Sequence, residues 1–275
     1  MKLLPPALLI AALSSGAAQA AETELWRLDC GTIAVKDLNA FSDNFAYGPA
    51  PKTLTNSCYL IRHDSDYLLW DTGLPLALLN APIDPEAPMS ATLTRDLPAQ
   101  LAEIGVTPER IGRIGLSHGH FDHTGQAATF PQATLMIGQP DLAAMEDTPP
   151  PFAFDPATLN HWRTGNGAVE AVTGDRDIFG DGSVTMLSMP GHTEGEMALL
   201  VRLEEAGPVL LSGDVVHFHE QIAAKSVPAF NMSRAESLAS MARLQEMAAN
   251  LDATLVIQHD AADIARLPAF PASAK

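Results

Sequence analysis

Short apolar runs recur along the chain, and their length is typical of buried β-strands. They fall into two clusters, separated by a loop that contains Pro149, Pro150 and Pro151. The predicted strands cover residues 25–35, 58–63, 67–70, 111–116 and 133–137 in the first cluster, and residues 169–172, 183–189, 198–203, 209–211 and 254–258 in the second.

Two longer segments indicate helices. In the first, leucine and isoleucine recur at spacings of four, four and three residues, which predicts a helix over 93–104. In the second, Ser233 and Glu236 form a capping box, and the helix that follows is predicted to run to about residue 251. A shorter helix is predicted over 141–146.

The order of these elements predicts the fold class. Strands come first, followed by a helix, more strands, and a final helix and strand, which gives two similar halves. This α+β order favours two sheets packed together with helices outside. We therefore predict a single domain over residues 21–275.

Charge narrows the range of partners. The chain of 275 residues has 16 Lys+Arg and 33 Asp+Glu, for a net charge of −17. Such a surface repels phosphate backbones and anionic lipids, so we expect neither nucleic acid nor membrane as a partner. Hydrophobic residues make up 47% of the chain and charged residues 18%, which is a globular composition.

The first twenty residues resemble a signal peptide. Lys2 precedes an apolar run over 3–13, and Ala18 and Ala20 give the small-x-small pattern of a signal peptidase site. The alternative is a buried N-terminal helix, against which Pro5 and Pro6 argue. We predict cleavage after Ala20 and a periplasmic or secreted protein.

Export affects the interpretation of the two cysteines. Cys30 and Cys58 lie in two predicted strand regions separated by a loop. Adjacent strands can bring such residues within disulfide distance, and an oxidising compartment permits the bond. Two buried thiols are the alternative, and the sequence does not decide between them.

The strongest chemical signal follows the predicted strand over 111–116. Within six residues the chain places three histidines and an aspartate, and this density of imidazole and carboxylate suits Zn²⁺ or a similar ion. Three more candidates follow later strands in the same way, which suggests that all of them converge. The candidate metal ligands are His118, His120, Asp122, His123, His192, Asp214 and His259.

These residues resemble the metal motif of the metallo-β-lactamase superfamily, and the resemblance extends over nearly all of residues 21–275. It implies an αββα sandwich with two divalent metal ions, expected to be zinc, and a hydroxide between them as nucleophile. One ion would take His118, His120 and His192, and the other Asp122, His123 and His259. Asp214 would bridge both ions.

Finer details resemble the N-acyl homoserine lactonase branch. They are the His-Thr-x-Gly segment at 192–195, the Gly-Asp pair at 213–214 and the His-Asp pair at 259–260. The resemblance implies hydrolysis of a small neutral lactone, and it leaves a homodimer open. Two alternatives remain: a phosphotriesterase or aryl esterase on the same site, and a metal-holding binding protein without catalysis.

Three further predictions concern individual residues. Asp122 and His217 are the candidate catalytic groups, and His217 stands where many lactonases of this branch have a tyrosine. Asp71 is expected to orient a ligand histidine through a hydrogen bond. Several aromatic residues are candidates for an apolar channel for an acyl chain, namely Phe41, Phe45, Tyr47, Phe121, Phe218 and Phe230.

Overall fold

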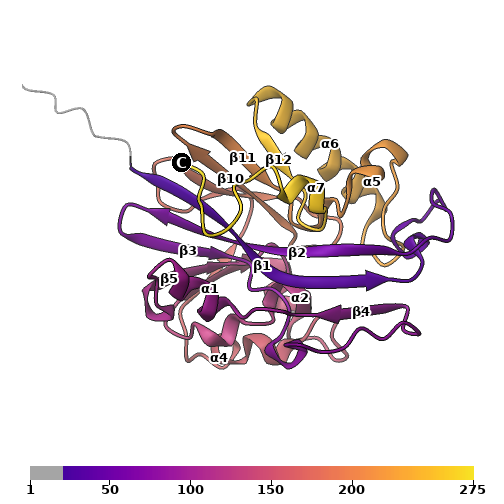
Figure 1. The fold of residues 1–275 in the computed structure, drawn as a ribbon, viewed down its shortest axis with the longest axis horizontal. Helices are drawn as coiled ribbons and strands as arrows, with labels where there is room; N and C mark the ends of the chain where they lie inside the picture. The colour runs from indigo at the N-terminus through magenta and orange to yellow at the C-terminus, as the bar shows by residue number, and fades with distance from the viewer. Residues whose placement is uncertain (1–20) are drawn as a thin grey trace, which may run out of the picture.

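The computed structural model describes residues 21–275, and the predicted signal peptide over 1–20 lies outside the described residues. Within the described range the strands form two sheets. Helices cover the outer face of each sheet, so the layers run helix, sheet, sheet, helix (Figure 1). The αββα sandwich predicted from the sequence is confirmed.

The larger sheet combines two pairing modes. Its N-terminal strands pair antiparallel, and from β3 onwards the strands pair parallel, with helical crossovers between them. In spatial order the strands within the described residues are β4 (Met89–Thr92), β1 (Thr23–Val35), β2 (Lys52–His63), β3 (Asp66–Trp70), β5 (Ile111–Gly115), β6 (Thr134–Gly138) and β7 (Val169–Val172).

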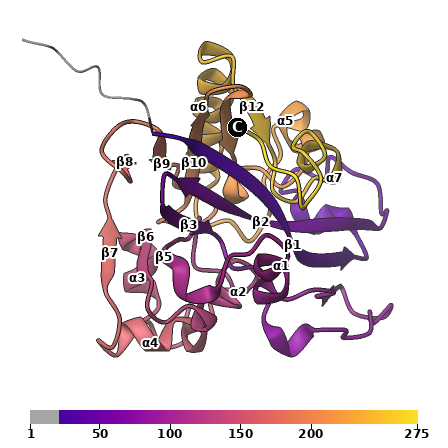
Figure 2. The ribbon, with the colours of Figure 1, turned by 60° about the vertical axis from the view of Figure 1, so that its left-hand side comes forward.

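The smaller sheet is formed by the C-terminal half of the chain. The chain enters it between β7 and β8, on the left of Figure 2. In spatial order its strands, again within residues 21–275, are β12 (Thr254–Val256), β11 (Gly207–Leu211), β10 (Met197–Leu203), β9 (Val184–Ser188) and β8 (Arg176–Asp177).

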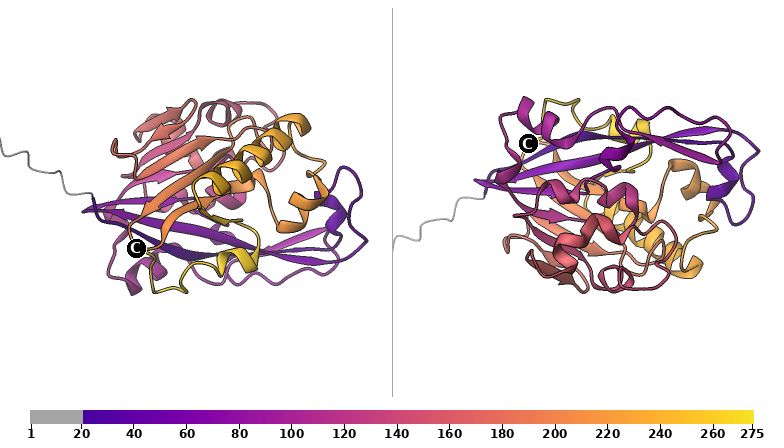
Figure 3. Two further views of the ribbon diagram at one scale, coloured as in Figure 1. Left: turned by 90° about the horizontal axis from the view of Figure 1, so that it is seen from above. Right: turned by 90° about the horizontal axis from the view of Figure 1, so that it is seen from below.

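The helices form the two outer layers, which Figure 3 shows from above and from below. The first layer covers the larger sheet and contains α1 (Leu97–Glu103), α2 (Phe121–Thr124), α3 (Gln139–Ala144) and α4 (Asn160–Arg163). The second covers the smaller sheet and contains α5 (His219–Ala224) and α6 (Arg234–Asn250), whereas α7 (Ala261–Ile264) lies beside β12 and β2. No helix within residues 21–275 is long and apolar enough to span a membrane.

The core follows the alternation of side chains along the strands. In β2, Tyr59 and Ile61 pack between the two sheets, whereas Cys58 and Leu60 pack toward the first helix layer. Both faces of β2 are therefore buried, which explains its nearly continuous apolar sequence. A third cluster, with Leu244 of α6, fills the space outside the smaller sheet.

Several predicted elements differ from the structure. β2 begins at Lys52 and not at residue 58, α3 covers Gln139–Ala144 and not 141–146, and the short strands β4 and β8 were not predicted. The helix predicted over 93–104 begins only at Leu97, because Asp96 caps it by accepting a hydrogen bond from the Ala99 N–H at 2.7 Å. Leu93 has the right spacing for the helix but is buried in the extended segment before it. The sequence reasoning also missed α5, which follows Phe218 directly.

The two cysteines form a disulfide in the structure. Cys30 of β1 and Cys58 of β2 are both fully buried, with their Cα atoms 5.8 Å apart. In the ladder Cys58 pairs with Leu28, and Cys30 lies two residues further along β1, in the bulge that follows Asp29. Of the two alternatives left open by the sequence, the structure has the disulfide.

Candidate metal centre

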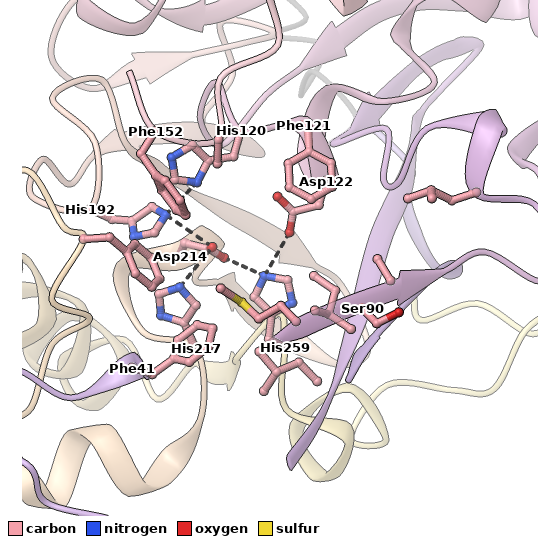
Figure 4. A pocket seen from close by; sticks show the side chains of 17 residues that line it. Phe41, Ser90, His120, Phe121, Asp122, Phe152, His192, Asp214, His217 and His259 are labelled. Carbon is pink, nitrogen blue, oxygen red and sulfur yellow. Dashed lines mark hydrogen bonds and ion pairs between the residues drawn. The ribbon is translucent and has the colours of Figure 1, made fainter. Parts of the chain in front are cut away.

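The predicted ligands lie at the ends of four strands and come together in one buried cluster (Figure 4). The turn after β5 and the start of α2 carry the residues of the first motif, and the loops after β9, β11 and β12 each add one ligand. The cluster contains His118, His120, Asp122, His123, His192, Asp214 and His259.

These residues divide into two groups. The first group is His118, His120, His192 and Asp214, and the second group is Asp122, His123 and His259. In each group the candidate ligand atoms lie within 4.8 Å of one another. The other six residues divide as the resemblance implied, whereas the resemblance assigned Asp214 to both groups.

Asp214 lies between the two groups. It sits in the short 3-10 turn Gly213–Val215, and its carboxylate faces five imidazole rings, as Figure 4 shows in part. The distances from Nε2 to the nearest carboxylate oxygen are 3.8 Å for His118, 3.6 Å for His123, 3.4 Å for His192, 3.2 Å for His217 and 3.0 Å for His259. Asp214 therefore contacts histidines of both groups, as the bridging role predicted for it requires.

The chemistry of this donor set fits two divalent metal ions. His118 Nε2 and His123 Nε2 are buried and have no hydrogen-bond partner, which is costly unless another group satisfies them. His120 Nδ1 and His192 Nε2 face each other at 3.1 Å. Metal bonds of about 2.0–2.1 Å in tetrahedral geometry hold neighbouring ligand atoms about 3.3 Å apart, so this spacing suits a shared ion.

The protonation of the first group also suits metal binding. Burial lowers the pKa of His192 to about 3. Burial, together with neighbouring imidazoles, lowers the pKa values of His118 and His120 well below their usual value. These rings are therefore neutral at physiological pH, which is the form that binds a metal ion.

In the second group, neighbouring carboxylates raise the pKa of a histidine. Burial alone would lower the pKa of His123, but the carboxylates of Asp122, Asp214 and Asp71 raise it well above its usual value. A metal ion bound there would replace the proton of this imidazole.

Most of the ligand histidines have a partner for their second ring nitrogen, as metal-binding histidines usually do. His123 Nδ1 lies 3.1 Å from Asp71 Oδ2, which is the contact predicted for Asp71. His192 Nδ1 lies 2.8 Å from Asn231 Oδ1, and His259 Nδ1 donates to the carbonyl of Thr55 at 2.6 Å. These contacts point the opposite nitrogen of each ring toward the cluster.

Two buried carboxylates support the first group, and the sequence analysis did not identify either. Glu196 Oε2 lies 3.2 Å from His118 Nδ1, and Glu196 Oε1 accepts a hydrogen bond from the Asp214 N–H at 2.8 Å. Asp141 accepts hydrogen bonds from the turn at Gly119 and from the loop at Gly195. Neither residue belongs to a local motif, and only the apolar run that follows Glu196 indicates that it is buried.

A cavity of about 310 Å³ opens beside the metal groups, and His217 lines it with Asp122 and Asp214. His217 is held through its N–H, which donates to Gln221 Oε1 at 2.6 Å, and by edge contact with Phe41. Its Nδ1 has no hydrogen-bond partner.

The rest of the cavity wall is largely apolar. Phe41, Phe121 and Phe230 line it as predicted, whereas Phe218 is buried behind the wall and Phe45 is 81% exposed. The sequence reasoning missed several wall residues, namely Ile33, Leu54, Leu78, Met89, Ala91 and Phe152.

Comparison with known families agrees with this geometry. The profile described as Metallo-beta-lactamase superfamily matches residues 52–259, which is most of the chain. The chain belongs to the metallo-β-lactamase superfamily. The match spans the four strand ends that carry the two metal groups, from β5 to β12.

Relatives within the superfamily include lactonases. The N-acyl homoserine lactonase AttM of Agrobacterium fabrum is 32% identical over 169 residues, which cover 58% of this chain and 62% of that protein. The match thus spans less than two thirds of the length of that relative.

Solved structures show the same metallo-β-lactamase fold. An N-acyl homoserine lactone hydrolase with N-hexanoyl-L-homoserine bound at its catalytic metal centre has a TM-score of 0.78 at 21% identity, over 93% of this chain and 100% of that chain. AidC, a dizinc quorum-quenching lactonase, has a TM-score of 0.66 at 17% identity, over 93% and 91% of the two chains.

Proposed function

We propose that this protein is a metal-dependent hydrolase that opens the lactone ring of N-acyl homoserine lactones. The observation that carries the proposal is one cavity with two histidine–carboxylate groups at one side and apolar side chains along its wall. No lysine or arginine of the described chain lines this cavity. A neutral lactone next to the metal groups, with its acyl chain along the apolar wall, matches both surfaces.

The relatives support this choice of substrate. AttM is an N-acyl homoserine lactonase, and the hydrolase of similar fold holds the ring-opened product N-hexanoyl-L-homoserine at its metal centre. The proposal implies quorum quenching, because ring opening destroys an acyl lactone signal.

We infer that the two ions are zinc. Histidine and aspartate are preferred zinc ligands, and AidC of the same fold is a dizinc enzyme. When bound, two such ions lower the pKa of a water molecule toward neutrality and polarise an ester carbonyl. His118, His120 and His192 would hold one ion, Asp122, His123 and His259 the other, and Asp214 both.

The residues of the chain move the proton and orient the ester. Water adds to the carbonyl carbon, the ring C–O bond breaks, and the released alkoxide takes up one proton. Asp122 lines the cavity and is assigned to accept the proton of the water and return it to the alkoxide. His217, on the other side of Asp214, is assigned to donate a hydrogen bond to the carbonyl oxygen or the departing alkoxide.

We further propose that the protein is exported with cleavage after Ala20. The Cys30–Cys58 disulfide supports this proposal, because such bonds persist mainly in oxidising compartments. Mass spectrometry of the mature N-terminus after expression in a bacterium with a periplasm would test it, and an intact Met1 would contradict it.

A substrate panel tests the proposed activity against its alternatives. Metal-loaded protein would be given short- and long-chain acyl homoserine lactones, paraoxon, an aryl ester, nitrocefin and a thioester, each with and without chelator. We expect chelator-sensitive hydrolysis with the acyl lactones as the best substrates. Much faster turnover of paraoxon or of the aryl ester would assign the site to that substrate class.

A further inference from the structure

The Cys30–Cys58 disulfide lies next to the segments that hold the second metal group. It is fully buried and takes no part in the cavity wall. Cys30 contacts the turn after β3, and Cys58 directly follows the segment Thr55–Ser57 of β2. Both segments contact residues of the metal cluster.

Cys30 packs against the turn after β3. Gly73 in this turn has φ +65°, and a Cβ there would lie 2.5 Å from Cys30 Cβ and 2.7 Å from Cys30 Sγ. The same turn holds His123, because the N–H and the hydroxyl of Thr72 donate to the His123 carbonyl at 2.7 and 2.9 Å. Asp71 of this turn contacts the His123 ring at 3.1 Å. Cys30 therefore supports the turn that fixes His123.

Cys58 follows the part of β2 that holds the other two ligands of the second group. The carbonyl of Thr55 accepts a hydrogen bond from His259 Nδ1 at 2.6 Å. The side chain of Asn56 donates to the Asp122 carbonyl at 2.8 Å. The disulfide thus joins the strand segment next to Thr55 and Asn56 to Cys30, which packs against the turn at Gly73. Together, that strand segment and that turn contact all three residues of the second group.

The first group is held mainly from elsewhere. His192 contacts Asn231, and Asp141 joins the turn at Gly119 to the loop at Gly195. The turn after β3 is connected to the first group through Ser117, which precedes His118: the Ser117 N–H donates to Asp71 Oδ1 at 2.7 Å.

We propose that the Cys30–Cys58 disulfide is a positioning bond for the second metal group. It keeps the turn at Asp71–Gly73 and the β2 segment at Thr55–Ser57 in their mutual positions, so that Asp122, His123 and His259 converge. Without it, the second group loses metal affinity and the first group keeps it. The inference rests on the metal centre of the proposed function, and it does not depend on which ester is cleaved.

The test measures zinc affinity in competition with a chromophoric chelator, with the metal content of each sample as a second readout. The test variant carries Cys30→Ala and Cys58→Ala, and the control is Leu203→Ala, a buried residue at the far end of β10. In the double variant we expect one of two zinc equivalents to weaken about 10- to 100-fold, as for loss of a positioning contact, and the other to stay unchanged. The control should keep both affinities.

Two further variants, each with one metal group disrupted, show which group is weakened when the disulfide is also removed. With Asp122→Ala, only the first group remains intact, and loss of the disulfide should leave zinc affinity unchanged. With His120→Ala, only the second group remains intact, and loss of the disulfide should weaken it. If the double variant folds poorly, Gly73→Ala takes its place, because it disturbs the contact with Cys30 and keeps both cysteines. We expect the same selective loss in this variant.

Four results would overturn the inference. The zinc affinity of both groups could weaken equally, that of the first group alone could weaken, neither could weaken, or Leu203→Ala could show the same loss as the double variant. A wild-type protein that binds fewer than two equivalents would overturn it together with the metal centre. Selective loss in a protein that hydrolyses no lactone would leave the inference standing and contradict only the proposed substrate.

Discussion

Asp141 joins the two loops that carry the first metal group, and its removal should leave a clear signature in stability. Its Oδ2 accepts hydrogen bonds from the Gly119 N–H at 2.8 Å and the Thr193 hydroxyl at 2.9 Å, and its Oδ1 accepts one from the Gly195 N–H at 2.7 Å. Burial nevertheless raises the pKa of Asp141 to about 6. The substitution Asp141→Asn keeps the size of the side chain and abolishes its titration.

The sign of the effect follows from the two pKa values. The pKa of Asp141 is about 6 in the folded protein and close to the reference value of 3.8 in the unfolded chain. The folded protein therefore binds this proton more tightly, and protonation stabilises it. The stabilisation is complete below pH 3.8 and is lost as the pH rises through 6. A difference of about two pKa units corresponds to about 3 kcal/mol.

Urea denaturation of the metal-free wild type and of Asp141→Asn measures this effect. Between about pH 4.5 and about pH 7.5, the wild type should lose about 2 kcal/mol of unfolding free energy relative to the variant. Titration of all other groups cancels in this difference. A difference that is independent of pH, or a wild type that gains stability as the pH rises, would show that the three hydrogen bonds outweigh burial.

Other predictions concern the metal centre itself. Asp214→Asn weakens the bridge between the two groups, and metal analysis should show loss of at least one equivalent. His217→Phe should lower kcat for lactone hydrolysis about 10- to 100-fold with unchanged metal content, and His217→Tyr should restore part of the rate; loss of metal from His217→Phe would instead identify His217 as a ligand. Glu196→Gln removes the carboxylate beside His118, and chelator competition should show about tenfold weaker zinc binding in the first group. Prolonged chelation should abolish hydrolysis and added zinc should restore it, and activity that persists in the metal-free protein would exclude the metal mechanism.

The sequence predicted those parts of the site that depend on local pattern. Histidines and aspartates directly after apolar strands predicted where the ligands lie, because strand ends of one sandwich meet at the same edge. The αββα layering followed in the same way from the order of strands and helices.

The residues that support the ligands could not be predicted in this way. Asp141 and Glu196 act through contacts with distant loops, and neither residue is itself part of a motif. The pairing of Cys30 with Cys58 depends on the register of β1 and β2 and on the bulge after Asp29, which a single sequence does not specify. The prediction that a helix begins at Leu93 was wrong, because Asp96 caps the helix and makes it begin at Leu97, although Leu93 has the apolar spacing of a helix.

Ring opening of N-hexanoyl homoserine lactone in water labelled with heavy oxygen tests the central claim most directly. The account predicts that metal-loaded protein produces N-hexanoyl homoserine with one heavy oxygen atom in its carboxylate, and that the metal-free protein does not. Mass spectrometry of the product distinguishes these results. An acyl lactone that remains intact with fully metal-loaded protein, or a product labelled at the hydroxyl instead, would contradict the proposed reaction.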